Sequence, residues 1–504
     1  MDLSQYKDIH YDSRKLEPGS IFVAIKGEKF DGHEFIVSAA QKGAKLVVVE
    51  NAVIQASQKL KKLVEELKLK YPDTKITEVE NTRKELAKLS HEFYGKPSKN
   101  LNLFGVTGTN GKTTVTHLLQ SIFSSTGSNC AIIGTMGLKK QVSEDYLDLG
   151  STTPQSKETH EIITSLVKEK FKNVAMEVSS HALEQYRVHK LNFKTSVVTN
   201  LTQDHLDYHL TMENYFKAKA KLFKQTEKFV VLNADDEYYA RFKQAAEQQG
   251  LIGISISAEA SEEADILAQN IKLNDGGLAY TLEIKESLVN KIEDLKLNKL
   301  EEKIKLKLGG TFNVYNSLFA IAVALTENIE LERIIDSLAK ISTVAGRFET
   351  IKEGDSPLCI VDYAHSPDGL KNVLEGARIL VKQKQNSKLI CLFGCGGDRD
   401  ITKRPKMGRI AYDLADKVYV TSDNPRSEDP EQIIADILTG IPDTQKVEII
   451  SDRASAIAKS IKDASSDDVV VVAGKGHEDY QILGDETIHF DDREEVRKAF
   501  LTLH

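Results

Sequence analysis

The 504-residue chain has little cysteine, no surplus of positive charge and no long apolar segment. Its four cysteines (Cys130, Cys359, Cys391 and Cys395) are too scattered for a disulfide framework, and no second pair completes a zinc pattern with Cys391 and Cys395. The formal net charge of -8 provides no broad basic surface, so we expect no nucleic-acid partner. The chain starts without a signal peptide and has no bilayer-spanning run, so we expect no membrane insertion and a cytoplasmic protein.

Composition and patterning indicate a soluble α/β protein. Hydrophobic residues make up 40% and charged residues 28%, as in ordinary globular proteins. Short β-branched runs alternate with longer amphipathic stretches, which predicts mostly parallel sheets, and the length suggests about three domains. The linker-like "YGKPSKN" and the later "STVAGRFE" divide the chain into blocks of residues 1–98, 99–340 and 341–504.

Polar residues repeatedly follow the apolar runs. The central block has the strand candidates "LFGVTG", "NVAMEVSS", "TSVVTN" and "FVVLNADD". The third block has "LCIVDYAHSPD", "LICLFGCGGDRD", "KVYVTSDNPR" and "VVVVAGKGHED". Because ligands bind beyond the carboxyl ends of strands in open α/β sheets, we expect the functional residues in these polar segments.

The segment "GVTGTNGKTT", residues 105–114, has the surroundings of a phosphate-binding loop. The strict pattern requires glycine five residues before Gly111, where Val106 stands. An apolar strand precedes the segment, and the helix that follows has an apolar stripe of Val115, Leu118, Leu119 and Ile122. A turn that needs glycine for its geometry alone is the alternative. We predict phosphate binding, with Lys112 reaching the β- and γ-phosphates and the Thr113 hydroxyl coordinating Mg²⁺.

Two further segments contain candidate metal ligands. Glu177 ends the run "NVAMEVSS", where it either organises a magnesium ion or is a helix-capping or exposed glutamate. The segment "TNLTQDHLDYH" contains Asp204, His205, Asp207 and His209, which form either a polar turn or a metal site. The mixture of histidines and acids favours the metal site.

Lys219 has an unusual position in "TMENYFKAKAKLF", for which we predict a helix capped by Thr211. At about 100° per residue, one face of that helix is apolar and consists of Met212, Tyr215, Phe216, Leu222 and Phe223. Lys219 falls within this face, whereas Lys217, Lys221 and Lys224 lie on the opposite one. Because an unpaired buried ammonium is costly, Lys219 must snorkel to solvent, pair with an acid or be modified.

With Gly108 three residues ahead of Gly111, the loop resembles the ATP-binding loop of the Mur ligase superfamily, which includes folylpolyglutamate synthase. The resemblance covers essentially the whole chain. It implies a central P-loop ATPase-like parallel sheet, flanked by an N-terminal uridine-nucleotide-binding α/β domain and a C-terminal Rossmann-like domain. It also implies a carbamate, derived from CO₂, on Lys219, and Mg²⁺ ligands Thr113, Glu177, His205 and that carbamate. The implied ATP-binding residues are Gly108, Thr109, Asn110, Gly111, Lys112, Thr113, Thr114, Asn313, Arg347, Asp362 and His365.

Other motifs resemble those of the Mur ligases that add the third residue of the peptidoglycan stem peptide. Residues that match the contacts to UDP-N-acetylmuramoyl-L-Ala-D-Glu are Ser13, Thr152, Thr153, Ser179, Gln185 and Arg187. Residues that match the contacts to meso-diaminopimelate are Arg399, Asp423, Asn424, Pro425, Arg426, Gly474 and Glu478. Taken alone, "SDNPRSEDP" is a turn with a surface arginine; the alternative is that the planar fork of Arg426 clamps a carboxylate.

The resemblance implies an ATP-dependent amide ligase that works through an acyl phosphate and acts as a monomer. Lys112, Lys219, His205 and Glu177 would be its catalytic residues. Diaminopimelate carries a second amino-acid head that L-lysine lacks, so the extra polar partners favour diaminopimelate as the substrate. An L-lysine-adding ligase, a folylpolyglutamate synthase and a P-loop switch protein without ligase chemistry are the alternatives.

Overall fold

A computed structural model describes residues 2–27, 30–274, 277–295 and 297–502. The chain forms two compact units. Unit 1 comprises Met1–Gly105, Ser128–Ser196 and Lys221–Glu227, and unit 2 comprises Val106–Gly127, Val197–Ala220 and Lys228–His504. Strands β5 (Asn102–Thr107), β9 (Phe193–Val198) and β10 (Thr226–Asn233) each begin in unit 1 and end in unit 2. The boundaries expected at residues 98 and 340 stay a prediction.

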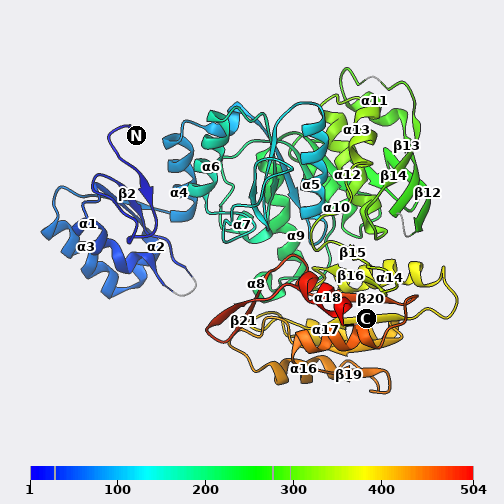
Figure 1. The fold of residues 1–504 in the computed structure, drawn as a ribbon. Helices are drawn as coiled ribbons and strands as arrows, with labels where there is room; N and C mark the ends of the chain where they lie inside the picture. Colours follow the sequence, from blue (N-terminus) through cyan, green and yellow to red (C-terminus); the bar gives the residue numbers. More distant parts are fainter. Residues whose placement is uncertain (1, 28–29, 275–276, 296, 503–504) are drawn as a thin grey trace. The chain divides into compact units, whose positions relative to one another are not determined.

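The N-terminal part of unit 1 is a four-stranded sheet in which all neighbours are parallel. In spatial order its strands are β1 (Ile9–His10), β2 (Ile21–Val23), β3 (Leu46–Glu50) and β4 (Lys75–Val79). Its helices are α1 (Ile36–Gln41), α2 (Asn51–Ala56), α3 (Gln58–Lys70) and α4 (Thr82–Phe93), and a 3₁₀ turn spans Gly32–Phe35 (Figure 1). Alternate residues of β3 point to opposite faces: Val47 packs with α1 and α3, and Val48 packs with α4.

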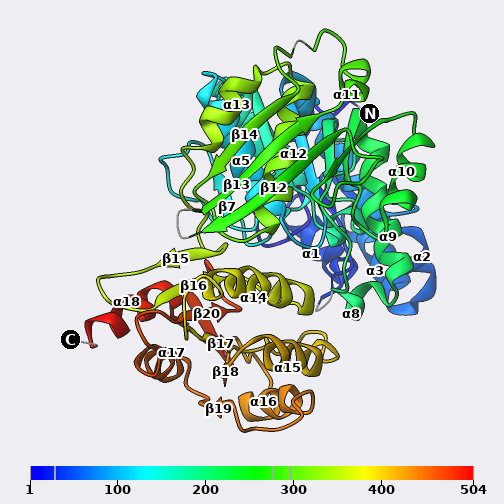
Figure 2. The same cartoon turned by 90° about the vertical axis from the view of Figure 1, so that its right-hand side faces the viewer.

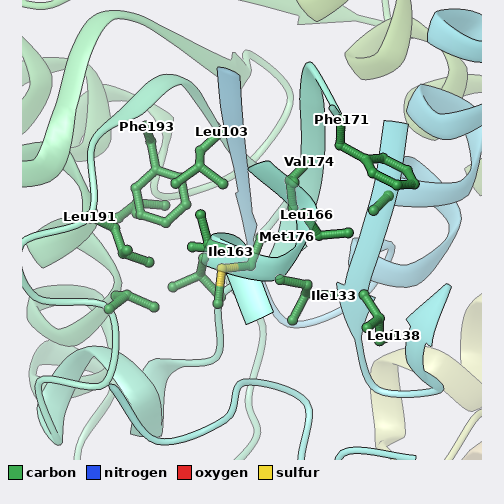
Figure 3. Close-up of a cluster of buried hydrophobic side chains, with 14 of the residues drawn as sticks. Leu103, Ile133, Leu138, Ile163, Leu166, Phe171, Val174, Met176, Leu191 and Phe193 are labelled. Atoms are coloured by element: carbon green, nitrogen blue, oxygen red, sulfur yellow. The ribbon is translucent and has the colours of Figure 1, made fainter. Parts of the chain in front are cut away.

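The rest of unit 1 surrounds a second core. Its elements include β6 (Cys130–Gly134), β7 (Gly137–Lys139), α6 (Ser156–Lys168), β8 (Asn173–Glu177) and α7 (Ser180–Glu184). Strands β6 and β8 are parallel, and β7 is antiparallel to β6. Figure 3 shows the buried cluster that these elements share, with Ile133, Ile163, Val174 and Phe193 among its members. Further 3₁₀ turns span Pro97–Asn100 and Lys221–Gln225.

The central part of unit 2 contains strands β10 to β14 in sequential order. The later strands are β11 (Ile252–Ser257), β12 (Ile266–Asn274), β13 (Gly277–Ile284) and β14 (Glu301–Leu306). The pairs from β10 to β12 are parallel, as predicted, whereas β12, β13 and β14 are antiparallel. The prediction is of mostly parallel sheets, and these strands are the exception: β12 and β13 are only two residues apart, too close for the crossover connection that parallel pairing needs.

Helices cover this part of unit 2, and α12 packs against both α5 and α13. The helices are α5 (Lys112–Ser125), α8 (Leu206–His209), α9 (Met212–Ala220), α10 (Tyr239–Glu247), α11 (Glu286–Lys291), α12 (Phe312–Thr326) and α13 (Leu331–Leu338). The predicted apolar stripe of α5, from Val115 to Ile122, is fully buried. None of the helices in the described parts of the chain is long and apolar enough to cross a membrane.

The C-terminal part of unit 2 is a six-stranded sheet, parallel except at the edge strand β15. In spatial order its strands are β15 (Glu349–Ile351), β16 (Leu358–Asp362), β20 (Val469–Ala473), β17 (Leu389–Phe393), β18 (Lys417–Val420) and β19 (Val447–Ile449). One face carries α14 (Pro367–Val381), α15 (Lys403–Leu414) and α16 (Pro430–Leu438), and the other carries α17 (Arg453–Lys462) and α18 (Asp492–Leu501) (Figure 2). Strands β21 (Tyr480–Leu483) and β22 (Glu486–His489) form a separate hairpin. The expected C-terminal Rossmann-like α/β domain, with a mostly parallel sheet between two layers of helices, is confirmed.

Candidate active site

The phosphate loop, which we define as Gly108–Thr114, has a backbone that only glycine allows at two positions. Gly108 has a φ of +141° and Gly111 a φ of +88°. A Cβ atom on Gly108 would overlap the Thr199 hydroxyl, and one on Gly111 would lie 2.5 Å from the Asn316 side-chain oxygen. Helix α5 begins directly after Gly111, so no side chain caps its first amides and they can face an anion. The spacing that misses the strict pattern therefore still gives a glycine-shaped loop before an uncapped helix start, as the predicted phosphate binding requires.

Lys112 lies over this loop. Its ammonium donates to the carbonyl oxygens of Gly108 at 2.9 Å and Thr109 at 2.8 Å. From the end of β9, the side-chain oxygen of Asn200 accepts from the amides of Thr109 at 3.2 Å and Asn110 at 2.9 Å. The loop is thus held from outside by Asn200, and Lys112 places a positive charge at its centre.

Two residues beyond position 340 contact the loop within unit 2. The Arg347 guanidinium donates to the Thr113 hydroxyl at 3.0 Å and lies 4.6 Å from the centre of the Tyr363 ring. Asn110 donates to the Asp368 carboxylate at 2.7 Å. The predicted ATP-binding residue Arg347 therefore lies against the loop that contains Asn110 and Thr113, although more than 200 residues separate it from them in sequence.

Asn313 and Asp362 are buried residues whose side chains hydrogen-bond to the backbone. Asn313 is fully buried, donates to the Gly309 carbonyl at 2.6 Å and accepts from Asn316 at 2.8 Å. Its role is indirect here, because Asn316 is the residue that lies beside the loop. The Asp362 carboxylate accepts from the Phe348 amide at 2.6 Å, and burial raises its pKa to about 6.

The Asp204 carboxylate lies close to two of the predicted histidines, His205 and His365. It lies 3.6 Å from His205 and 3.9 Å from Nε2 of His365. Burial opposes its ionisation, but His205, His365 and Lys403 outweigh that effect and hold its pKa at about 2. Lys403 also donates to the His365 carbonyl at 2.8 Å, and burial lowers the pKa of the His365 ring to about 4. The site therefore combines an anionic aspartate with a neutral histidine.

Lys219 is buried, with 1% of its surface exposed. Its Nζ lies 4.4 Å from the centre of the Tyr215 ring, and no carboxylate forms an ion pair with it in the described parts of the chain. Burial and the nearby charge of Lys112 lower its pKa well below the ordinary value, while Asp204 acts in the opposite direction. Burial of Lys219 and the lack of an ion pair in the described parts of the chain speak against snorkelling and ion pairing, so modification, the third alternative, stays as the prediction. The Thr211 cap is confirmed by its hydroxyl, which accepts from the Asn214 amide at 3.1 Å.

The four polar residues of the "DHLDYH" segment do not converge. Asp204 and His205 are neighbours, but Asp207 is exposed and the buried His209 stacks on the Tyr215 ring at 4.9 Å. Over the described ranges, no group of three or more His, Cys, Asp or Glu side chains is arranged to bind a metal. The four side chains therefore do not form a metal site by themselves in the described residues, and the role of His205 as a metal ligand stays a prediction.

In unit 1, Glu177 has a fixed carboxylate. The side chain is 1% exposed, and Thr135 donates to it through the backbone amide at 3.1 Å and the hydroxyl at 3.0 Å. A Cβ atom on Gly134 would overlap the carboxylate, so the glycine makes room for it. Helix α7 is capped by Ser179, not by Glu177. The cap and exposed-residue interpretations of Glu177 are therefore wrong.

The predicted dipeptide-binding residues form one hydrogen-bonded network around Glu177. The Thr135 hydroxyl meets that of Thr152 at 3.1 Å. The Thr153 hydroxyl donates to the Glu177 carbonyl at 2.9 Å and accepts from the Ser179 amide at 3.1 Å. Its carbonyl accepts from Arg187 at 2.9 Å. The structure thus brings four of these residues together.

The N-terminal part reaches the same network. Arg187 donates twice to the Gln185 side chain, at 2.8 and 3.1 Å, and Arg83 donates to the same oxygen at 3.4 Å. Tyr11 donates to Glu158 at 3.1 Å. Ser13, two residues after Tyr11, is half-buried and accepts from Lys42 through its carbonyl at 2.8 Å. Sequence reasoning missed Tyr11, whose only signal was its proximity to Ser13, and Arg83, which no predicted motif lies near.

The segments Asp423–Arg426 and Gly474–Glu478, which we call the paired segments, are joined by side chains. Asn424 donates to Glu478 at 2.9 Å, and the buried Lys475 contacts Asn424 at 3.3 Å and Glu478 at 3.4 Å. Burial and the charge of Asp423 raise the pKa of Glu478. A Cβ atom on Gly474 would lie 2.6 Å from the Asp423 carboxylate, so the approach requires glycine.

Arg426 has a left-handed backbone with a φ of +53°, held by the β21–β22 hairpin. Its amide donates to the Ile482 carbonyl at 3.2 Å, and its side chain donates to the Gly397 carbonyl at 2.8 Å. A Cβ atom on Gly396 would lie 2.8 Å from the Arg426 guanidinium and 3.9 Å from Cγ of the exposed Arg399. Arg426, at the end of the first paired segment, and Arg399 therefore lie on either side of Gly396.

Comparison with known proteins agrees with this arrangement. Three family models match successive stretches: "Mur ligase family, catalytic domain" at residues 5–94, "Mur ligase middle domain" at 106–324 and "Mur ligase, glutamate ligase domain" at 346–476. The chain belongs to the Mur ligase family.

Among its relatives is UDP-N-acetylmuramoyl-L-alanyl-D-glutamate--2,6-diaminopimelate ligase 1 of Clostridium acetobutylicum, 41% identical over 97% of this chain and 93% of that protein. The ligase of the same name from Bacillus cereus is 40% identical over 97% and 93%. A solved ligase of that name superimposes with a TM-score of 0.67 at 31% identity, covering 99% of this chain and 95% of its own. MurF from Thermotoga maritima in complex with ADP shares the fold, with a TM-score of 0.61 at 18% identity over 100% and 98%.

Proposed function

We propose that the protein joins meso-diaminopimelate to the D-glutamate γ-carboxyl of UDP-N-acetylmuramoyl-L-Ala-D-Glu, with ATP converted to ADP and phosphate. The observation that carries this proposal is the near-full-length similarity, at 41% identity, to a ligase named for these substrates. The phosphate loop and the paired segments supply sites of the matching chemistry. We propose that the reaction takes place in the cytoplasm and that the enzyme acts as a monomer, without a nucleic-acid partner.

In the proposed reaction, a carboxylate oxygen of D-glutamate attacks the γ-phosphorus of ATP, and ADP leaves. The amine of diaminopimelate then attacks the acyl phosphate, loses a proton and expels phosphate through a tetrahedral intermediate. Because the carboxylate and the γ-phosphate are both anionic, positioning and charge neutralisation dominate the barrier. Lys112 lies where it can neutralise the β- and γ-phosphates, and Arg347 approaches from the Thr113 side.

The proposed ATP-binding set is the phosphate loop together with Asn313, Arg347, Asp362 and His365. Its support is the convergence of Arg347 and Asp368 on the loop and the packing of Asn313 behind Asn316. For the dipeptide substrate we propose Ser13, Thr152, Thr153, Ser179, Gln185 and Arg187. For the diaminopimelate head we propose Arg399, Asp423, Asn424, Pro425, Arg426, Gly474 and Glu478.

We propose Thr113, Glu177, His205 and carbamylated Lys219 as Mg²⁺ ligands. The hydroxyl and carboxylate oxygens suit this hard cation, and the Glu177 carboxylate is already oriented by two bonds from Thr135. When bound, Mg²⁺ supplies positive charge beside the transferring phosphoryl group.

The buried amine of Lys219 fits carbamylation. Its neutral nitrogen attacks the carbon of CO₂ and releases a proton, and the product is a carbamate anion beside Tyr215 and near Asp204. We expect ¹³C-NMR of enzyme equilibrated with ¹³CO₂ to show one carbamate resonance that Lys219→Ala abolishes. Lys217→Ala, which removes an exposed lysine of the same helix, is the control that keeps it. An unmodified wild-type enzyme would contradict the carbamate.

Phosphate release tests the proposed function. Enzyme, ATP, Mg²⁺ and UDP-N-acetylmuramoyl-L-Ala-D-Glu are incubated with meso-diaminopimelate, with L-lysine or with neither. We expect phosphate release in the incubation with meso-diaminopimelate and not in the other two. Turnover with lysine would show a lysine-adding ligase, and release that ignores both substrates would show a switch protein. No turnover with either amine, but turnover with a folate and glutamate, would show folylpolyglutamate synthase.

A further inference from the structure

Arg453, which no motif above includes, is a fully buried arginine at the start of α17. Its side chain and that of Asp492, the first residue of α18, are both 0% exposed. The two form a bidentate pair, with Nε and Nη2 of the arginine each 2.7 Å from a carboxylate oxygen. Burial opposes the charge, but Asp492 and then Asp423 and Glu478 raise the pKa of the guanidinium.

The remaining donors of Arg453 reach two strand ends. Nη2 donates to the Ala473 carbonyl at 3.0 Å, and Nη1 donates to the Ser422 carbonyl at 3.3 Å. Ala473 is the last residue of β20, and Ser422 follows β18. Each carbonyl directly precedes one of the paired segments.

The sheet itself does not join these two strand ends. In spatial order β17 lies between β20 and β18, so no backbone ladder connects the two. The Arg453 guanidinium spans that gap. Its Nη2 also lies 3.8 Å from the position a Cβ atom would take on Gly474. Besides the contacts among Asn424, Lys475 and Glu478, the paired segments are thus linked at their starts by one planar group with donors in fixed directions.

Stability alone is a poor reason for this arrangement. Burying two charges costs free energy that their attraction offsets only in part, and apolar residues of similar volume are often as stabilising. What apolar residues could not replace is the link between the two strand ends, because an apolar side chain cannot donate to the Ser422 and Ala473 carbonyls.

We propose that Arg453 is a positioning residue for recognition of the amino-acid substrate: it sets the distance between Asp423–Arg426 and Gly474–Glu478, and so the fit of the substrate's distal amino-acid head. This inference rests on the proposed function, because the paired segments are assigned to that head there. Arg453 acts through the segments and does not itself contact substrate.

The test compares Arg453→Lys with the double variant Arg453→Met/Asp492→Leu. Lysine keeps the charge but loses the fork, and the double variant removes both charges together. In both, we expect the KM for meso-diaminopimelate to rise about tenfold. The KM values for ATP and the UDP-dipeptide should stay within about twofold, since those sites share no contact with Arg453. The double variant should also recover the Tm that Arg453→Lys loses.

Asp265→Asn is the matched control. Asp265 is a buried acid directly before β12 and is paired with Lys291 at 2.7 Å. The Asp265→Asn variant should have a lower Tm than the wild type, without a selective change in any of the three KM values.

Three results would overturn the inference: an unchanged KM for the amine in Arg453→Lys, a parallel rise in all three KM values, or a normal amine KM in the double variant with Tm restored. Wild-type turnover in the same assay judges the proposed function separately. The ratio of the amine KM in each variant to that in the wild type tests the role of Arg453, whichever amine the wild type accepts.

Discussion

The phosphate loop and the paired segments both follow the ends of strands in mostly parallel sheets, but they are built in different ways. The loop is one continuous stretch whose shape comes from Gly108 and Gly111, and its key charge, Lys112, bonds to the loop's own carbonyls. The paired segments are about fifty residues apart and meet through side chains, with Asn424 bonded to Glu478 and Lys475 to both.

The difference separates two kinds of substrate recognition. Backbone amides and a helix start suit a phosphate group, which is the same in every nucleotide. Side chains held by other side chains suit a substrate that must be told apart from a close analogue, because unpaired polar groups reject the analogue. Substitutions in the loop should therefore impair all turnover, and those in the paired segments should change the choice and the affinity of the amine.

The largest effect is expected for Lys112→Ala. It removes the positive charge over the loop, so phosphate release at saturating substrates should fall about a thousandfold. Lys243→Ala, at an exposed lysine paired with Glu263, is the control and should keep wild-type activity. A Lys112→Ala enzyme with more than about a tenth of wild-type activity would contradict the role of the loop.

A matched glycine pair tests the backbone of the loop. Gly108→Ala, before helix α5, adds a methyl group that overlaps Thr199. Gly127, after helix α5, has a φ of +76°, and a methyl group there would lie in open space. We expect kcat/KM for ATP to fall about a hundredfold in the first, since small displacements of a catalytic loop have effects of this size. Gly127→Ala should change Tm only. Equal kinetic effects of the two would show that strain, not loop shape, is responsible.

Arg426→Lys tests the paired segments. Lysine keeps the charge but not the planar fork, so the KM for diaminopimelate should rise about tenfold to a hundredfold while the KM for ATP stays constant. The control is Arg409→Lys, at an exposed arginine paired with Asp413 at 2.8 Å. If Arg426→Lys raised both KM values alike, the contrast between the two regions would fail.

The smallest effect concerns stability near the loop. The pKa of Asp362 rises from an ordinary 3.8 to about 6 on folding, so its ionised form costs up to about 3 kcal/mol at alkaline pH. Below pH 3.8 the carboxyl is protonated in both states and the cost is absent. Asp362→Asn should therefore raise Tm above about pH 6, with a benefit that disappears below about pH 4. Thermal unfolding across pH measures it, and a pH-independent difference would contradict this assignment.

The same contrast explains what could be predicted from sequence. Continuous features were predictable: the strands, the buried stripe of α5, the Thr211 cap and the unusual environment of Lys219 all follow from local spacing. Partners brought by tertiary folding were not: Asn200 lies in a quoted strand-end segment, but nothing local shows that it holds the phosphate loop, and nothing local marks Asn316 or Thr135 as neighbours of the predicted residues. Lys475 was within a quoted motif, but its burial between Asn424 and Glu478 depends on strands that only the fold places together.

The central claim, ligation through an acyl phosphate, is tested most directly with the D-glutamate γ-carboxylate labelled with ¹⁸O at both oxygens. Mass spectrometry of a completed reaction with ATP and diaminopimelate should find one ¹⁸O in the released phosphate and one in the new amide carbonyl. Phosphate without ¹⁸O, alongside a formed amide, would contradict the account, because the carboxylate oxygen would then never have been joined to phosphorus.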